Sequence, residues 1–178
     1  FRKARTYRKW RAEPVTPQML MAAYDLMRWG PTTNNTCPAR IAFVVSQAAK
    51  ERLKPHLNKG NVEQTMTAPA IAIFAYDLRF YDQMPKLSPN NPTSRESWMQ
   101  KTPAEIEEAA FRSGTLQAAY FMFAARAVGL DCGPMSGFGN QGVDKEFFAG
   151  TSVKSNFLCN LGYGSDRKST RLNSSHIP

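Results

Sequence analysis

Residues 116–142 read LQAAYFMFAARAVGLDCGPMSGFGNQG, and the sequence changes character abruptly at Gly129. From Leu116 to Val128 apolar residues occupy nearly every side of a helix, so we expect this part to be buried all round. It would form the end of a long helix that starts at Thr102 and Pro103, a good cap and first-position pair. From Gly129 onward glycines recur, which predicts a loop region up to residue 142.

The sequence on either side of this stretch predicts both strands and helices. Three short apolar runs rich in β-branched and aromatic residues are typical of strands: IAFVV (41–45), AIAIFAY (70–76) and FLCNLGYG (157–164). Helices are predicted from Pro17 to the stop at Gly30, over 47–57 and over 143–149, with a turn at 60–61. Strands and helices mix without strict alternation, which favours an α+β layered domain.

Residues 78–101 form a long excursion between the second strand and the long helix. Pro85, Pro89, Asn90, Asn91 and Pro92 cluster in it, and Trp98 follows. Long connections in compact domains are often lids or binding loops, so we expect a functional role here.

The basic character of the chain is local. The formal net charge is +9, but residues 1–11 contribute +6 and residues 165–178 contribute +2, which leaves +1 for residues 12–164. A neutral body without a stacking motif argues against a nucleic-acid binder, which would show steeply salt-dependent affinity. A local anion site or a solvated helix end explains the basic N-terminal stretch better.

Cysteine and histidine are scarce, with three and two copies in 178 residues. A sparse, odd set of cysteines without a leader predicts reduced thiols in a cytoplasmic protein. Two histidines argue against a Ser-His-Asp triad, a zinc finger or a multi-histidine metal site, so no metal is expected. No apolar run approaches the length of a membrane helix, so we expect no membrane partner.

The last residues differ from the rest. Residues 166–176 read DRKSTRLNSSH, which resembles the in-frame translation of a sequencing-adapter oligonucleotide. We therefore expect one domain over residues 1–164, cut at both ends, followed by an artefact over 165–178 that takes no part in the fold.

Several short motifs are ambiguous when taken singly. GFGNQG (137–142) matches a dinucleotide-binding pattern, but it lies late in the chain and lacks a following acid for the ribose, so we reject it. RKARTYRKW (2–10) suits either a phosphate or a solvated helix end. The loop PTTNNTCPAR (31–40) suits either a polar ligand or ordinary turn chemistry. Asn61 is either a turn residue or an amide ligand.

The order of these segments resembles the nitroreductase family of flavoenzymes over residues 1–164. The matching segments are WGPTTNNTCPAR (29–40), KERLKP (50–55), GN (60–61), TAP (67–69), AFRSGTLQAAY (110–120), GLDCGPMSGF (129–138) and KSNFLCNLGYG (154–164). Within the family, the sequence is most similar to the malonic semialdehyde reductases (3-hydroxypropionate dehydrogenases) of uracil breakdown. Many nitroreductases carry Glu where this chain has Ser136, and that difference is typical of this branch.

The resemblance implies an α+β sandwich, with a central mixed or antiparallel sheet flanked by helices. It also implies an intertwined homodimer with one FMN at each of two interface sites. By position, the residues that would bind FMN are Arg5 and Lys9 at its phosphate and pyrimidine edge, Asn61 at the isoalloxazine edge, and Pro134, Met135, Ser136 and Gly137 beside flavin N5. A loop that would reach the FMN of the other subunit contains Pro31, Thr32, Thr33, Asn35 and Pro38.

One departure from the family concerns a second basic cluster beyond the GYG segment, which helps to bind the FMN phosphate in relatives. Residues 165–178 replace it here, so Lys168 and Arg171 are not candidates despite their charge.

The implied chemistry is transfer of a hydride from NAD(P)H to FMN N5 and then to a small substrate, with no catalytic protein nucleophile. The preferred substrate is malonic semialdehyde, reduced to 3-hydroxypropionate in pyrimidine degradation. A broad nitro or quinone reductase of the same fold is the alternative. A non-catalytic flavin-binding protein is the alternative from a different class.

Overall fold

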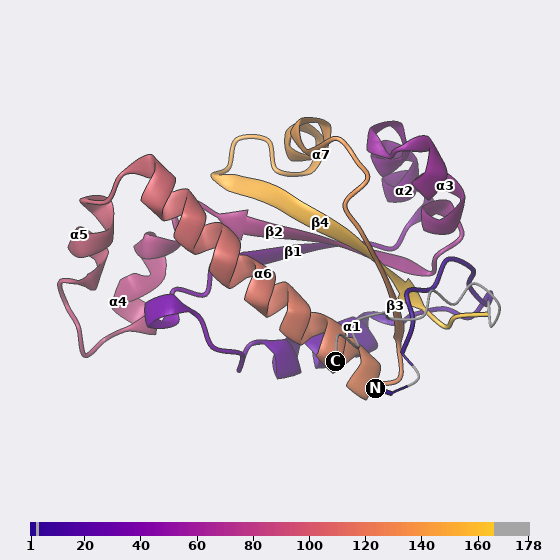
Figure 1. Ribbon diagram of the computed structural model, residues 1–178, viewed down its shortest axis with the longest axis horizontal. Coiled ribbons are helices and arrows are strands. Elements are labelled where there is room, and N and C mark those ends of the chain that lie inside the picture. The colour runs from indigo at the N-terminus through magenta and orange to yellow at the C-terminus, as the bar shows by residue number, and fades with distance from the viewer. Residues whose placement is uncertain (3, 166–178) are drawn as a thin grey trace, which may run out of the picture.

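The computed structural model describes residues 1–2 and 4–165, and its centre is a four-stranded sheet (Figure 1). The strands are β1 (Ala39–Val44), β2 (Ala70–Asp77), β3 (Asp131–Met135) and β4 (Val153–Gly162). Their order is β1-β2-β4-β3, and every neighbouring pair is antiparallel. The expected α+β fold is therefore present, with an antiparallel sheet.

Helices cover both faces of the sheet, as Figure 1 shows. They are α1 (Pro17–Met27), α2 (Gln47–Leu53), α3 (Lys59–Met66), α4 (Met84–Leu87), α5 (Ser94–Met99), α6 (Pro103–Ala127) and α7 (Asn140–Phe147). Three 3₁₀ helices are η1 (Thr33–Asn35), η2 (Lys54–His56) and η3 (Phe80–Gln83). Helices α1 and α6 lie on one face, and α2, α3 and α7 lie on the other.

Alternation along β2 explains the two layers. Ala72 and Phe74 face the core formed with α1 and α6, whereas Ile71 and Ile73 face the core formed with α2, α3 and α7. All four side chains are almost completely buried. A strand covered on both faces reads as a continuous apolar run, because successive side chains point to opposite sides of the sheet.

The long helix α6 begins where the sequence predicts. Thr102 accepts from the backbone N–H of Glu105, and the Glu105 carboxylate accepts from the backbone N–H of Thr102, which is a capping box. The expectation that its second half is buried all round is wrong in the single chain. Leu116, Tyr120 and Phe123 are 48%, 43% and 55% exposed. They follow one another at helical spacing and form one apolar stripe, because residues i, i+4 and i+7 share a face.

Two local expectations fail because tertiary contacts override the turn propensity of glycine. Residues 131–135 form β3 rather than a loop, because Gly133 and its neighbours pair with β4. Gly60 and Asn61 lie inside α3 rather than in a turn. Helix α2 ends earlier than predicted, at Leu53, and η2 continues the chain through Pro55.

The excursion over 78–101 is largely helical, containing η3, α4 and α5. Phe80 is fully buried there, and its ring meets the Trp98 ring edge-on at 4.9 Å between centroids. Asp82 joins η3 to α5 through an ion pair with Arg95 (2.9 Å). The segment is thus a small packed subassembly rather than an open loop.

Within the described part of the chain, no helix is both long enough and apolar enough to cross a membrane. The predicted artefact over 165–178, including Lys168 and Arg171, lies outside the described residues apart from Ser165.

Candidate functional site

The N-terminal segment runs along the outer edge of β3. The backbone N–H of Tyr7 donates to the carbonyl of Cys132 (3.2 Å), and that of Arg11 donates to the carbonyl of Tyr163 (2.8 Å). A side chain at position 133 would prevent this docking, because a Cβ on Gly133 would lie 2.5 Å from the Tyr7 carbonyl oxygen. The basic stretch is therefore fixed to the sheet and is not a free helix end.

Arg5 and Lys9 lie on this segment with exposed side chains. Arg5 donates to the neighbouring carbonyl of Ala4 (2.9 Å). Among the ion pairs of the described residues, none involves Arg5, Arg8 or Lys9. Their positive charge is consequently available to an anion, and arginine is well shaped for phosphate.

Helix α3 brings Asn61 against the loop that follows β3. The Asn61 amide nitrogen Nδ2 donates to the Gly137 carbonyl (2.8 Å), and the backbone N–H of Asn58 donates to the same oxygen (3.0 Å). A Cβ on Gly137 would lie 2.5 Å from Asn61 Nδ2, so only glycine fits here without displacement. Two residues expected to bind the cofactor thus contact each other directly.

The other three residues of the 134–137 segment are also well defined. Pro134 and Met135 belong to β3, and the Met135 sulfur accepts from the hydroxyl of Thr65 on α3 (3.5 Å). Ser136 follows the strand and is exposed. The strand end therefore presents a small hydroxyl and backbone groups, with no carboxylate among residues 132–137.

Three hydrogen bonds made by Gln64, which sequence reasoning missed, connect these parts. Its side-chain Nε2 donates to Asn61 Oδ1 (2.6 Å). Its backbone carbonyl accepts from the Trp10 indole N–H (3.0 Å) and from Asn160 Nδ2 (3.1 Å). The i,i+3 spacing of Asn61 and Gln64 on a helix could have suggested their pairing, because such residues are surface neighbours.

The loop over 31–38 lies elsewhere in the single chain. The Asn35 amide donates to the carbonyl of Leu87 on α4 (2.8 Å), and the Thr33 backbone N–H donates to the hydroxyl oxygen of Ser113 on α6 (3.3 Å). The α4 end of the molecule is opposite the β3 end in Figure 1. Pro31, Thr32 and Pro38 belong to the same loop, so these five residues do not join Arg5, Lys9, Asn61 and Gly137 within one chain.

The 31–38 loop has an unusual backbone. Asn34, Asn35 and Cys37 have positive φ values of 47°, 56° and 42°. Left-handed conformations are costly for residues other than glycine, and asparagine tolerates them best. The Thr32 hydroxyl supports the bend by accepting from the backbone N–H of Cys37 (3.2 Å).

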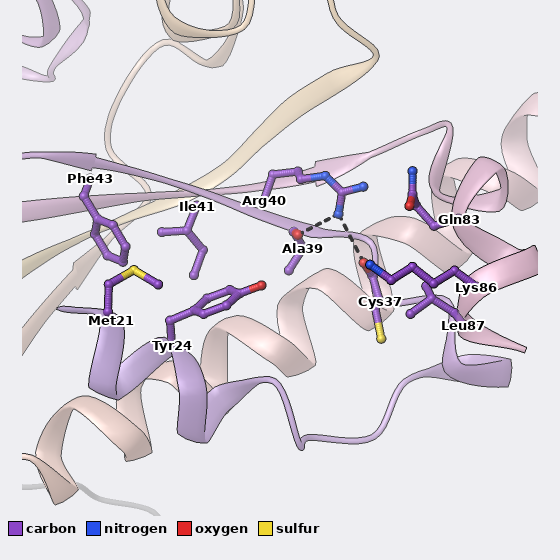
Figure 2. A pocket seen from close by; sticks show the side chains of 10 residues that line it. All are labelled: Met21, Tyr24, Cys37, Ala39, Arg40, Ile41, Phe43, Gln83, Lys86 and Leu87. Carbon is purple, nitrogen blue, oxygen red and sulfur yellow. Dashed lines mark hydrogen bonds between the residues drawn. The ribbon is translucent and has the colours of Figure 1, made fainter. Parts of the chain in front are cut away.

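A separate cavity of about 630 Å³ borders the edge strand β1 (Figure 2). Met21 and Tyr24 of α1, together with Ile41 and Phe43 of β1, form its apolar part. Lys86 of α4 lies at its polar end with Arg40, Gln83, Cys37 and Leu87. None of the twelve residues expected to bind the cofactor lines this cavity.

Two cysteine thiols lie beneath the N-terminal segment, shielded from solvent. Cys132 and Cys159 are both fully buried on neighbouring strands. Burial raises the pKa of the Cys159 thiol well above its ordinary value, which keeps it protonated. Within the described residues, no group of three His, Cys, Asp or Glu side chains could hold a metal ion.

Comparison with known proteins identifies the family. The profile of the nitroreductase family matches residues 1–163. The chain belongs to the nitroreductase family. A relative from Cupriavidus pinatubonensis, named as an NADH dehydrogenase or NAD(P)H nitroreductase, is 51% identical over 171 residues, covering 94% of this chain and 86% of that protein.

Solved structures of nitroreductase-family proteins have the same fold. A nitroreductase from Bacillus subtilis matches with a TM-score of 0.85 at 17% identity, covering 99% of this chain and 94% of that chain. A nitroreductase from Exiguobacterium sibiricum, solved in complex with FMN, matches with a TM-score of 0.85 at 19% identity, covering 95% and 89%. The predicted α+β nitroreductase fold is confirmed, and so is the expectation of an oxidoreductase of this family.

Proposed function

We propose that this nitroreductase-family chain is an NAD(P)H-dependent FMN oxidoreductase that reduces malonic semialdehyde to 3-hydroxypropionate in pyrimidine degradation. The observation that carries the cofactor assignment is the convergence of the basic N-terminal segment, Asn61 and Gly137 through the hydrogen bonds of Gln64 and Trp10. The relative named as an NAD(P)H nitroreductase supports the same assignment.

The residues present fit FMN in charge and shape. Arg5 and Lys9 supply exposed cations for a phosphate. After its bonds to Gly137 and Gln64, the Asn61 amide keeps one N–H and one oxygen lone pair, which suit the alternating donors and acceptors of a flavin pyrimidine edge. When bound, FMN supplies the hydride chemistry, and the protein supplies binding and orientation.

The charges around the site favour a small anionic substrate. Residues 132–137 contain no carboxylate, and Ser136 is exposed. Arg5, Arg8 and Lys9 lie exposed on the neighbouring segment. Without a carboxylate in residues 132–137, this part of the site does not repel the carboxylate of malonic semialdehyde, and it would lose that advantage with a glutamate at position 136.

A second copy of the chain would complete the site. The apolar stripe of Leu116, Tyr120 and Phe123 is exposed, and Trp29 beyond α1 is 79% exposed. Large apolar surfaces of this kind mark interfaces. A homodimer that covers the stripe would let the 31–38 loop of one subunit reach the FMN of the other.

A nitro or quinone reductase of broad specificity is the second candidate, because the 51% identical relative is named for nitroreductase activity. Purified protein would be titrated with FMN, and NAD(P)H oxidation would then be followed with malonic semialdehyde and with a nitroaromatic compound. Flavin absorbance bands that stay with the protein, and a higher kcat/KM for the aldehyde, are expected. Efficient turnover of the nitroaromatic alone would favour the second candidate, and a protein that takes up no FMN would exclude both.

A further inference from the structure

We propose that Gln64 is a positioning residue that orients the Asn61 amide for the flavin. This inference rests on the proposed FMN site. In this proposal Asn61 contacts FMN, and Gln64 acts only through its hydrogen bond to Asn61.

The orientation of Asn61 follows from a backbone carbonyl. The Gly137 oxygen can only accept, so the Asn61 group facing it at 2.8 Å must be the NH₂ group. The Asn61 oxygen then points the other way, and only a donor can satisfy it there. Gln64 presents its NH₂ group to that oxygen at 2.6 Å, so the Gly137 carbonyl selects the amide orientation and Gln64 holds the oxygen end of the side chain in place.

Gln64 itself is anchored independently of its side chain. Its carbonyl accepts from the Trp10 indole and from Asn160, whose side chain is fully buried. These two bonds fix the last turns of α3 against the N-terminal segment and β4. The amide of Gln64 therefore starts from a rigid base, and a substitution of its side chain leaves both backbone contacts in place.

Without the Gln64 donor, the Asn61 side chain is held only by its bond to the Gly137 carbonyl. The Asn61 oxygen then accepts hydrogen bonds from water instead, and the remaining bond to Gly137 no longer holds the side chain in one rotamer. The flavin edge would meet an amide that moves among several rotamers, which weakens binding and changes the hydrogen bonding of the ring.

The test is a double-mutant cycle on FMN affinity with Gln64→Leu, Asn61→Ala and the double variant. Gln64→Leu should weaken FMN binding about tenfold, the effect of one hydrogen bond of ordinary strength. It should also shift the visible absorbance band of the bound flavin. In the Asn61→Ala background, Gln64→Leu should change affinity by less than about twofold, because its effect passes through Asn61.

Two further variants control for folding. Gln47→Leu removes another side-chain bond of an exposed glutamine, to Glu51 on α2 (3.0 Å), and should leave FMN affinity and the flavin spectrum unchanged. Gln64→Glu keeps size and polarity but has no donor, and should reproduce the loss. The melting temperature of the FMN-free protein should fall no more in Gln64→Leu than in Gln47→Leu.

If the double variant loses FMN affinity by the product of the two single losses, Gln64 does not act through Asn61 and the inference is overturned. An unchanged spectrum of the bound flavin in Gln64→Leu would also overturn it. Both results leave the FMN site intact, because the unsubstituted protein still binds FMN. An unsubstituted protein that binds no FMN overturns the proposed function and this inference with it.

Discussion

The indole N–H of Trp10 donates to the backbone carbonyl of Gln64 at 3.0 Å, joining two residues that are 54 positions apart in the chain. This bond attaches the segment that carries Arg5 and Lys9 to the helix that carries Asn61. The charge-bearing and amide-bearing parts of the candidate site are therefore linked to each other directly, in addition to the bonds that attach each of them to the sheet.

Trp10→Phe keeps an aromatic ring and removes the indole donor. We expect the free energy of unfolding to fall by about 1 kcal/mol, as for one ordinary hydrogen bond, and FMN affinity to fall about fivefold as the segment loosens. Urea unfolding and FMN titration measure the two effects. Trp98→Phe, whose ring packs on Phe80 in the 78–101 segment, is the matched control. Equal behaviour of the two variants would show that the Trp10 bond does not support the site.

Gly137→Ala introduces a Cβ 2.5 Å from Asn61 Nδ2 and should displace the amide. We expect at least about a tenfold loss of FMN affinity, because an orienting bond is broken and the loop shifts. Gly60→Ala, where a Cβ meets nothing within 4 Å inside α3, should bind FMN normally and gain about 0.5 kcal/mol from helix propensity. Normal FMN binding by Gly137→Ala would contradict this account.

Ser136→Glu adds a carboxylate beside the proposed substrate site. The KM for malonic semialdehyde should rise about tenfold because like charges repel, whereas the KM for a neutral quinone should change little. Ser136→Gln, of the same size without the charge, separates repulsion from bulk. Steady-state kinetics with both substrates measure the split, and an equal rise for both would indicate a steric effect.

Phe123→Glu places a charge in the apolar stripe of α6. We expect the dimer dissociation constant to rise about 100-fold, since central interface residues commonly contribute more than 2 kcal/mol. Sedimentation velocity over a concentration series measures it. Ala104→Glu, exposed in the first turn of the same helix, should not change association. If the unsubstituted protein is a monomer, the proposal that two subunits form the FMN site together is wrong.

The Asp82 carboxylate predicts how acid affects the 78–101 segment. A hydrogen bond from Arg95, and then one from Arg79, lowers the pKa of Asp82 below its ordinary value of 3.8. A carboxyl with a depressed pKa in the folded state stabilises that state above its unfolded pKa, and this contribution is lost as the pH falls through the folded pKa. The stability difference between the unsubstituted protein and Asp82→Asn should therefore be full at pH 6 and shrink as the pH falls below the ordinary pKa of 3.8. Unfolding curves at several pH values measure it, and a constant difference would disprove the link.

The sequence predicts the local elements of this fold better than their contacts. Periodicity and capping place α1 and α6, because Thr16, Thr102 and the apolar runs act within a few residues. β3 escapes prediction because Gly133 and Pro134 have low strand propensity, and pairing with β4 holds them extended. The exposed stripe of α6 could not be predicted, because an apolar composition is typical both of a buried core and of a surface that binds another chain.

The candidate site was predicted by resemblance and not by residue chemistry. Arg5 and Asn61 each have an ordinary surface interpretation when read alone. Arg5 and Asn61 belong to one candidate site because the Trp10 indole donates to the Gln64 carbonyl. This contact joins segments that are far apart in the sequence, so no local sequence pattern predicts it. Whether the twelve predicted residues bind FMN stays a prediction for the titrations above.

The position of β4 in the sheet also sets the order in which the molecule can be made. β4 lies between β2 and β3, yet it leaves the ribosome after the other three strands of this sheet. Until it emerges, β1 and β2 can pair as a hairpin, but β3 and the N-terminal segment have no strand to hold them. A nascent chain stopped before residue 153 therefore exposes one side of β2, a state that chaperones recognise. Binding of the proposed cofactor must wait until β4 has been synthesised, because this strand holds β3 and the N-terminal segment beside β2.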